Sequence, residues 1–334
     1  MSSVKVQVPG LFTTVQDFGR FGYQRFGVPV AGVFDRYATS IANWLVGNEA
    51  KTAVLEVSYL GPTLQTDCTL QAAITGGTVS ATLDGEPVLC YQSFTWRPGQ
   101  VLAMGGMLAG ARAYLAVSGG WQVPLVMESA STYVRAALGG HHGRKLQAGD
   151  ELPVQPTESI LSRRLPRAFW SVIRPEVCLR FVPGPQEDHF QSETVELFRQ
   201  SSFRVASASD RMGIRLQGPA VTPERPDIVS DAIALGSIQV PKDGQPIIMG
   251  PDHQTAGGYP KIGTVLSCDM DKLAQLKPGD SISWQPVSVD DARQIILRVA
   301  TFRQRVKQVI LGEATGKEYR IKLAGQEFYS FVER

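Results

Sequence analysis

The chain has few cysteines, no long apolar run and no excess of charge of one sign. Its four cysteines, Cys68, Cys90, Cys178 and Cys268, form no Cys-x-x-Cys pair among the 334 residues, which predicts reduced, buried thiols in a cytoplasmic protein. No stretch approaches the ~18 apolar residues of a membrane span, and the N-terminal residues lack a secretory core. With 33 Lys and Arg against 31 Asp and Glu, nothing favours nucleic acid or a membrane surface as a partner.

Several catalytic signatures are also absent. The sequence contains no phosphate loop, no dinucleotide fingerprint and no nucleophile elbow. His141 and His142 are adjacent, so their side chains diverge in an extended segment, and His189 and His253 lie far away. These spacings predict no metal held by the protein. The Ala-Met-Lys-Met sequence of a biotin carrier is missing too, so this chain is not expected to carry covalent biotin.

Glycine and proline, by contrast, are frequent, with 33 and 21 residues. They separate short runs rich in Val, Ile, Leu and Thr, a pattern typical of a mostly antiparallel β protein, barrel or sandwich. The clearest runs are residues 69–74, 78–83, 101–104, 113–117 and 177–182.

Few helices are expected. Asp35 precedes a segment with apolar residues at helical spacing that ends at Gly47. Asp269 is placed to cap a short helix that ends near Leu276. The longest begins at Asp290 and has an apolar stripe, predicted to pack on its own domain. That stripe comprises Ile295, Val299, Phe302, Val306 and Val309 or Ile310.

The two halves share short motifs in the same order. Each half has Val-Pro-Gly after an apolar run, then Arg-x-Gly with a further glycine, then Leu-x-x-Gly-Asp, ending at Asp150 and Asp280. This order indicates an internal duplication. The chain should therefore divide into an N-terminal β domain (residues 1–155), a proline-rich linker (156–175) and a C-terminal β-barrel domain with a final helix (176–334).

The densest group of polar residues follows a predicted hairpin. Residues 238–248 form two β-type runs around Asp243-Gly244, a strong hairpin signal. The loop from Asp252 to Pro260 then carries a carboxylate, an imidazole, amides, a hydroxyl, two glycines and a phenol. Such a loop is suited to hold a small polar molecule, although its residues are also ordinary turn formers. Asp252 is the candidate acid/base or ligand contact, or else the first residue of an Asx-turn.

A second polar loop lies near the N-terminus. Gln16, Asp17 and Arg20 fall within five residues of one another, and arginine can hold a carboxylate or phosphate through two hydrogen bonds. The alternative is an Asp17–Arg20 pair that serves only the fold. Residues 139–144 could cradle an anion, but a mobile loop is the safer interpretation.

Longer motifs resemble a known family. They are residues 10–20, 32–35, 41–48 and 55–57 in the first half, and 210–218, 239–241, 244–246 and 252–260 in the second. Together they resemble the C subunit of the bacterial ATP-dependent 5-oxoprolinase. That family is also described as allophanate hydrolase subunit 2 and as the antagonist of a sporulation-kinase inhibitor. It resembles part of the carboxyltransferase domain of urea carboxylase as well.

The resemblance implies two related halves built on cyclophilin-like closed β-barrels. It implies a cytoplasmic hydrolase that acts with the B subunit (a kinase-inhibitor homologue) and the A subunit of the enzyme. The complex would bind and phosphorylate 5-oxoproline for ring opening to L-glutamate, with ATP and Mg²⁺ bound by the complex rather than by this chain alone. Catalytic candidates are Arg20, Arg211 and Asp252. Substrate-binding candidates are Gln16, Asp17, Gln239, Gln245, His253, Gln254, Thr255, Gly257, Gly258 and Tyr259.

The chain also departs from the family pattern. The family usually has Thr at Ala256 and Ala at Gly263, and the part after Pro286 extends beyond the match. Two other functions therefore stay open. One is a regulatory protein that binds a kinase-inhibitor homologue without chemistry. The other is a carboxyltransferase component of a urea or amide carboxylase.

Overall fold

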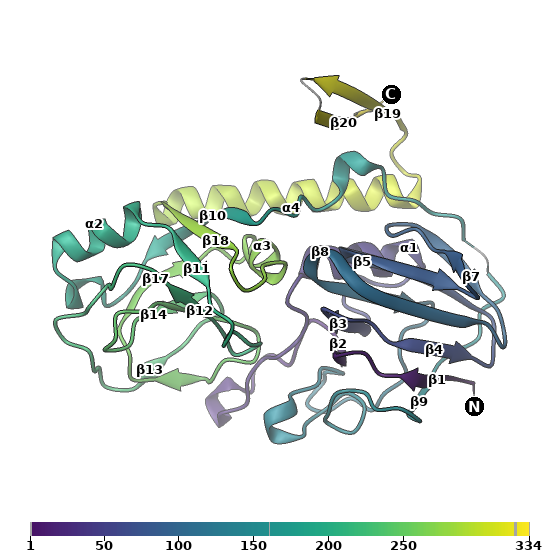
Figure 1. Cartoon of the computed structure of the whole chain (residues 1–334), viewed down its shortest axis with the longest axis horizontal. Coiled ribbons are helices and arrows are strands. Elements are labelled where there is room, and N and C mark those ends of the chain that lie inside the picture. Colours follow the sequence, from purple (N-terminus) through teal and green to yellow (C-terminus); the bar gives the residue numbers. More distant parts are fainter. Residues whose placement is uncertain (1, 160, 324–325, 334) are drawn as a thin grey trace.

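The computed structural model describes residues 2–159, 161–323 and 326–333. Two β-rich halves lie side by side, and one long helix runs along both (Figure 1). This confirms the mostly β fold with few helices.

The N-terminal half is a nine-stranded sheet. Its main path has the order β2-β3-β8-β4-β1-β9; β5 also pairs with β8, and β6 and β7 pair with β5. The strands are β1 (Ser3–Val8), β2 (Phe12–Gln16), β3 (Val54–Ser58), β4 (Thr63–Thr66), β5 (Leu70–Leu83), β6 (Glu86–Pro87), β7 (Ser93–Trp96), β8 (Val101–Val117) and β9 (Glu151–Pro153). Their inward side chains form one apolar core that includes Leu55, Trp96 and Leu115.

The expectation of many short strands was wrong for β5 and β8. Residues 70–74 and 78–83 of the predicted runs belong to the single strand β5, and residues 101–104 and 113–117 belong to β8. The glycines between them permit close contact rather than a break. A Cβ at Gly77 would lie 2.8 Å from the carbonyl oxygen of Ala109 on the paired strand. The register of the pair shifts between Gly76 and Ala81, as at β-bulges.

The second half is a closed seven-stranded barrel of order β10-β17-β14-β15-β12-β11-β18. Its strands are β10 (Glu176–Pro183), β11 (Phe203–Val205), β12 (Gly213–Gln217), β14 (Ser237–Gln239), β15 (Ile247–Met249), β17 (Lys261–Val265) and β18 (Ser281–Pro286). Strands β14 and β15 pair antiparallel around the predicted turn, where Gly244 has φ +73°. Two two-stranded sheets lie outside the barrel: β13 (Asp231–Ala232) with β16 (Ala256–Gly257), and β19 (Gly316–Leu323) with β20 (Gln326–Glu333).

The Leu-x-x-Gly-Asp turns have the same hydrogen bonds in both halves. Asp150 accepts the backbone N–H of Gln147 at 2.8 Å, and Asp280 accepts that of Lys277 at 2.9 Å. In each case the aspartate directly precedes a strand, β9 or β18. The motif thus marks equivalent turns, in support of the inferred relation between the halves.

Local sequence signals predicted the positions of two helices correctly. In α1 (Arg36–Leu45) Asp35 accepts the N–H of Ala38 at 2.8 Å, as the predicted N-cap. The helix α4 (Val289–Leu311) is capped by Ser288. In α3 (Met270–Ala274) the side chain of Asp269 makes no cap. The remaining α-helix of the described residues, α2 (Ser192–Gln200), packs Phe198 against Trp284 of the barrel, with ring centroids 4.6 Å apart.

Helix α4 connects the two halves. It contacts β10 and α1, and Val306 and Ile310 near its C-terminal end are buried in the core cluster that contains α1. Arg303 on the same helix forms an ion pair with Asp271 of α3. The apolar stripe predicted to pack on the second domain therefore also packs on the first.

Candidate functional site

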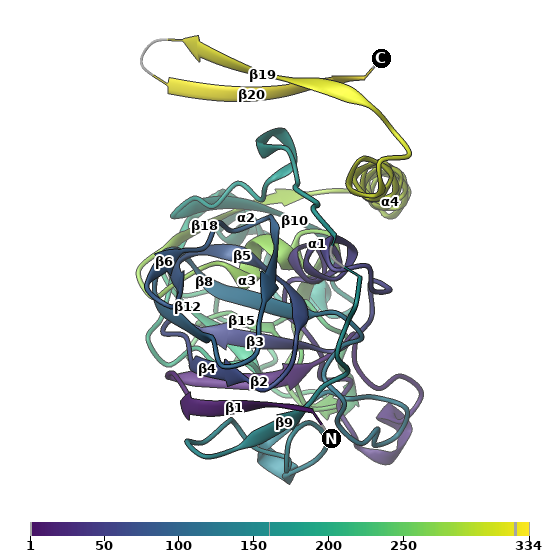
Figure 2. The ribbon, with the colours of Figure 1, turned by 90° about the vertical axis from the view of Figure 1, so that its right-hand side faces the viewer.

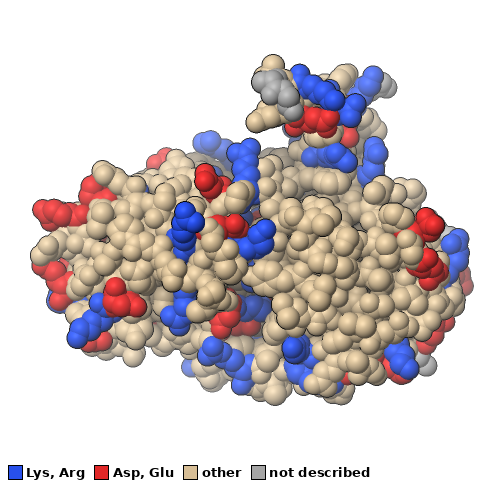
Figure 3. All heavy atoms as spheres, in the orientation of Figure 1, with Lys and Arg blue, Asp and Glu red and all other residues tan. Residues whose placement is uncertain are grey.

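Two adjoining cavities lie where the halves meet. The groove cavity, of about 450 Å³, is lined from the N-terminal half by residues such as Leu11, Tyr59, Arg112 and Val134, and from the barrel by Arg211 and Asp252. The barrel-mouth cavity, of about 240 Å³, is lined by Arg215, Gln239, Gln254 and Tyr259, among others. Arg135, Asp210 and Met212 line both cavities. In the view of Figure 3, charged side chains gather along the line between the halves.

Arg211 is the centre of a buried ion network. Its Nε and Nη2 donate to the two carboxylate oxygens of Asp252 at 2.9 and 2.8 Å. Its Nη1 donates to Glu56 of β3, and Nη2 also donates to the carbonyl oxygen of Gly32 at 2.6 Å. Burial alone would lower the pKa of Arg211, but Asp252 and Glu56 together raise it above its ordinary value. Two predicted catalytic residues thus form an ion pair, and the bond from Arg211 to Glu56 joins the barrel half to β3.

Glu56 extends this network of ion pairs and hydrogen bonds into the N-terminal half. Its Oε2 accepts the backbone N–H of Phe34 at 2.8 Å, and its Oε1 lies 3.8 Å from Nε of Arg112. Arg112 also stacks over the ring of Phe34, 4.5 Å from its centroid. Two arginines and two carboxylates therefore balance each other in this buried region, as buried charges require.

Arg20 differs from Arg211 because most of its donors are unused. It is only 1% exposed, and its Nη2 donates to the carbonyl oxygen of Ser131. Its Nε and Nη1 have no partner. Burial lowers the pKa of Arg20, although Asp17 and Asp252 oppose that shift. A buried cation with two free donors is costly for the fold, and such an exception calls for an explanation beyond packing.

Gln16 bonds to the residue next to the one that Arg20 contacts, and it too has a polar atom without a partner. Its Nε2 donates to the carbonyl oxygen of Thr132 at 3.1 Å, one residue beyond the oxygen that Arg20 contacts. Its Oε1 is buried without a partner. Beside Ser131 and Thr132, Gln16 therefore keeps a free acceptor and Arg20 keeps two free donors.

The carboxylate of Asp17 bonds to the segment at Ser129–Ser131 and not to Arg20. Its carboxylate accepts hydrogen bonds from the hydroxyls of Ser129 and Ser131 at 2.6 and 2.5 Å, and from the N–H groups of Gly19 and Ala130 at 2.8 and 2.7 Å. All of these bonds hold the loop that carries Arg20. The alternative of an Asp17–Arg20 hydrogen-bonded pair is not what the structure shows, because the carboxylate of Asp17 bonds to Ser129, Ala130, Ser131 and Gly19 instead.

Some residues of the loop from Asp252 to Tyr259 line the barrel-mouth cavity, and others only support the backbone. Gln254 and Tyr259 line the barrel-mouth cavity with Gln239, whose Nε2 lies 3.5 Å from the carbonyl oxygen of Tyr259. His253 is buried, which lowers its pKa, and its Nδ1 lies 2.6 Å from the carbonyl oxygen of Gln254.

Three further residues of that loop support the backbone. The carbonyl oxygens of Thr255 and Gly258 accept backbone N–H groups from the 228–233 segment at 3.0 and 2.9 Å. Gly257 pairs with Asp231 in the β13–β16 sheet. These residues therefore position the loop through their main chain.

Gln245 is not among the residues that line either cavity. It holds both backbone groups of Gly218, accepting its N–H at 3.0 Å and donating to its carbonyl at 3.3 Å. Conversely, sequence reasoning missed Glu56, Arg112 and the Arg135–Asp210 ion pair of 3.4 Å. A usable signal existed for Glu56, since it is a lone carboxylate in the otherwise apolar strand β3.

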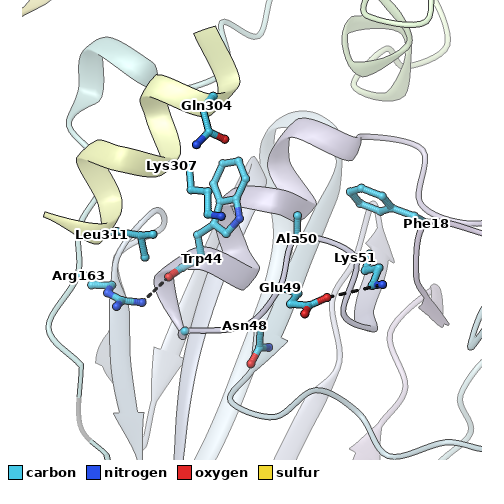
Figure 4. Close-up of a pocket in the computed structure, with 11 residues that line it drawn as sticks. Phe18, Trp44, Asn48, Glu49, Ala50, Lys51, Arg163, Gln304, Lys307 and Leu311 are labelled. Atoms are coloured by element: carbon cyan, nitrogen blue, oxygen red, sulfur yellow. Dashed lines mark hydrogen bonds and ion pairs between the residues drawn. The ribbon is translucent and has the colours of Figure 1, made fainter. Parts of the chain in front are cut away.

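A larger cavity, of about 730 Å³, lies between α1, the 47–51 loop and α4 (Figure 4). None of the predicted site residues lines it. Arg163 donates to the carbonyl oxygen of Trp44 at 2.8 Å, so it caps the C-terminal end of α1, where cations are favoured. Lys51 pairs with Glu49 at 3.7 Å. These cations therefore have a structural explanation.

Comparison with known proteins identifies the class. The family described as the carboxyltransferase domain, subdomain A and B, matches residues 26–286, and the chain belongs to this family. In the part of the chain that the structure describes, no helix is long and apolar enough to cross a membrane.

Individual relatives narrow this assignment to the group formed by the C subunits of 5-oxoprolinase. The chain is 36% identical to the 5-oxoprolinase C subunit of Haemophilus influenzae, over 89% of this chain and 95% of the relative. It is 36% identical to the Escherichia coli one, over 86% and 93%. The crystal structure of Kluyveromyces lactis urea amidolyase superposes with a TM-score of 0.86 at 31% identity, covering 91% of this chain but 20% of that one.

Proposed function

We propose that this chain is the C subunit of an ATP-dependent 5-oxoprolinase complex in the cytoplasm, where it helps to bind and activate 5-oxoproline for ring opening to L-glutamate. The observation that supports this most is coverage. The chain matches 95% of the length of the Haemophilus influenzae C subunit, whereas it matches 17% of Saccharomyces cerevisiae urea amidolyase.

The unused groups suit this substrate. 5-Oxoproline has a carboxylate, a lactam N–H and a lactam carbonyl. Arg20 and Gln16 line neither cavity between the halves, so substrate would reach them only if their loop moves. The free donors of Arg20 would then match the carboxylate, or the phosphoryl group in transfer. The free Oε1 of Gln16 matches the lactam N–H. Gln239, Gln254 and Tyr259 of the barrel-mouth cavity would then contact the rest of the ring. Arg211 and Asp252 act as positioning residues in this scheme, because their side chains already hydrogen-bond to each other.

The chemistry explains why ATP is needed. A lactam is an unreactive amide. Transfer of the γ-phosphoryl group to the lactam oxygen breaks the terminal phosphoanhydride bond and releases ADP, while the lactam N–H proton is lost. Water then adds to the ring carbon, and the C–N bond breaks as the nitrogen is protonated. A second water releases phosphate from the resulting acyl phosphate. The chain's contribution would be positioning and charge stabilisation, with ATP and Mg²⁺ held by the complex of the A, B and C subunits.

Reconstitution tests this function directly. The three purified subunits are mixed with ATP, Mg²⁺ and 5-oxoproline, without biotin, and each one is omitted in turn. We expect 5-oxoproline-dependent ADP release and glutamate formation only in the complete mixture. Turnover that persists without this chain would contradict the proposal. Tight association with the B subunit but no turnover would instead favour the regulatory function.

One observation favours a second candidate, a carboxyltransferase component. The chain is 33% identical over 314 residues to Saccharomyces cerevisiae urea amidolyase. Such a component would require a separate biotin carrier. Decarboxylation of carboxybiotin by this chain in the presence of urea, with no 5-oxoproline turnover in the complete mixture, would support that activity.

A further inference from the structure

The β19–β20 hairpin is set off from the rest of the molecule (Figure 2). It lies beyond residues 26–286, which match the carboxyltransferase family. It rests on the short helical turn Arg167–Phe169 through three contacts. The rings of Phe331 and Phe169 are 5.2 Å apart, Glu318 accepts the N–H of Ala168 at 3.1 Å, and Arg167 donates to the hydroxyl of Tyr329 at 3.0 Å. A two-stranded hairpin alone is at best marginally stable in water, so these contacts matter for its position.

A cavity of about 350 Å³ lies between the hairpin and the rest of the chain. We call it the hairpin cavity. Three arginines line it, Arg164 and Arg167 from the 163–170 segment and Arg320 from β19. The cavity is therefore complete only when the hairpin is docked. None of these residues lines either cavity between the two halves.

The positive charges are incompletely balanced. Glu318 is the only carboxylate among the residues that line the cavity. Glu327 lies 3.8 Å from Arg320, but it also pairs with Lys322 at 3.4 Å. Arg164 makes no side-chain hydrogen bond or ion pair with any residue that the structure describes. Docking thus brings like charges together, which is unfavourable unless an anion enters.

The arrangement favours an oxyanion with two negative charges. Guanidinium groups bind phosphate through paired hydrogen bonds, which a point charge such as lysine does not provide. Arg167 is held in place between two rings, 5.3 Å from the centroids of both Trp170 and Tyr329. The apolar side chains Leu89 and Leu165 complete the lining, and the volume exceeds that of a phosphate ion.

We propose that the hairpin cavity binds a phosphate group, either as the free ion or as a small phosphate monoester, and that this anion holds the C-terminal hairpin against the 163–170 segment. The site is separate from the proposed 5-oxoproline site. Its occupancy would set whether the hairpin is docked, and the two properties can be measured independently.

Calorimetry on the full chain tests binding. Inorganic phosphate and AMP are titrated separately, at constant ionic strength set with chloride. We expect saturable binding of at least one of them, weakened about tenfold by Arg164→Gln or Arg320→Gln, since each removes charge-assisted hydrogen bonds. The matched control is Arg97→Gln, which changes an exposed arginine outside this cavity and should leave binding unchanged.

The two ligands distinguish free phosphate from a phosphate ester as the bound anion. Binding of AMP alone would identify a phosphate ester, and binding of inorganic phosphate, with or without AMP, would identify the free ion. Hydrogen exchange then measures docking. At the same subsaturating concentration, the ligand that binds should slow exchange of residues 316–323 in the wild type more than in Arg164→Gln. Absence of binding by both ligands, binding unchanged in both arginine variants, or exchange unaffected by bound ligand would overturn the proposal.

Discussion

Asp252 and Arg211 form a two-point ion pair in which both carboxylate oxygens accept hydrogen bonds, at 2.8 and 2.9 Å. Both side chains are buried, and Arg211 extends the contact to Glu56 in the other half of the molecule. The carboxylate that opens the polar loop is therefore occupied by a structural partner. Arg20 keeps two donors without a partner and is the better candidate for contact with substrate, although it lines neither cavity between the halves.

Replacing Arg20 and Arg211 by methionine should give opposite results. Arg20→Met removes a buried charge with two unpaired donors, so the free energy of unfolding should stay unchanged or rise. Arg211→Met leaves Asp252 and Glu56 without their cation and should lower the free energy of unfolding by about 3–5 kcal/mol. Denaturant unfolding measures both.

In the reconstituted complex, Arg20→Met should lower 5-oxoproline turnover by at least about 100-fold, as expected for loss of a charge-stabilising contact. Full turnover in a folded Arg20→Met protein would rule out the proposed role of Arg20. The matched control is Gln245→Ala, whose amide bonds, among the described residues, only to the backbone of Gly218, and which should keep turnover near that of the wild type.

Asp252→Asn separates a positioning role from acid/base catalysis. Asparagine keeps the shape of the side chain but loses the charge that holds Arg211. If Asp252 acts through Arg211, turnover should fall by about tenfold with the shape of its pH profile unchanged. The measurement is kcat against pH for wild type and variant. Loss of the acidic limb of the profile in the variant would show instead that Asp252 transfers a proton.

The extent to which the sequence predicts this molecule depends on how local each signal is. The N-cap at Asp35 and the turn at Gly244 were correct because both depend on residues a few positions apart. The glycines of β5 and β8 were misjudged as strand ends because their role is close contact with a strand some 30 residues away. At Gly105, for example, a Cβ would lie 2.3 Å from the hydroxyl of Ser80.

The same distinction applies to the site. Sequence motifs identified Arg20, Arg211 and Asp252 as a group, but nothing in the sequence indicates which of the three keeps free donors. The partner that occupies Arg211 in addition to Asp252 is Glu56, 155 positions earlier in the chain. Arg20 remains free because Asp17 bonds to Ser129 and Ser131 instead, more than 110 positions away. Only the tertiary structure shows these choices.

The contact between α4 and the N-terminal half should contribute measurably to stability. Ile310 is only 4% exposed in the cluster that contains α1, so Ile310→Ala should lower the free energy of unfolding by about 2–4 kcal/mol. Leu297 lies on the same helix but is 53% exposed, and Leu297→Ala should change it by less than about 0.5 kcal/mol. Equal effects of the two substitutions in thermal or urea unfolding would show that α4 does not pack as described.

Asp35 should make stability depend on pH in the neutral range. Burial, followed by the proximity of Asp271, raises the pKa of Asp35 to about 7, while the hydrogen bonds from Ala38 and Gln275 oppose the shift. A raised carboxyl pKa means that the folded state binds this proton more tightly than the unfolded state does. The contribution of Asp35 to the free energy of unfolding should therefore increase as the pH falls from 8 to 5.

The effect is isolated by comparing wild type with Asp35→Asn, since asparagine is also a good N-cap. Burial lowers the pKa of His141 and His253, so their contributions fall as the pH drops through the same range. The contributions of the two histidines are common to both proteins and cancel in the difference. Burial also raises the pKa of Asp271, which titrates together with Asp35, so the difference reports the Asp35–Asp271 pair. The free energy of unfolding of wild type minus that of Asp35→Asn should rise by more than about 1 kcal/mol between pH 8 and pH 5. A flat difference for Asp35→Asn would show that Asp35 does not titrate in this range.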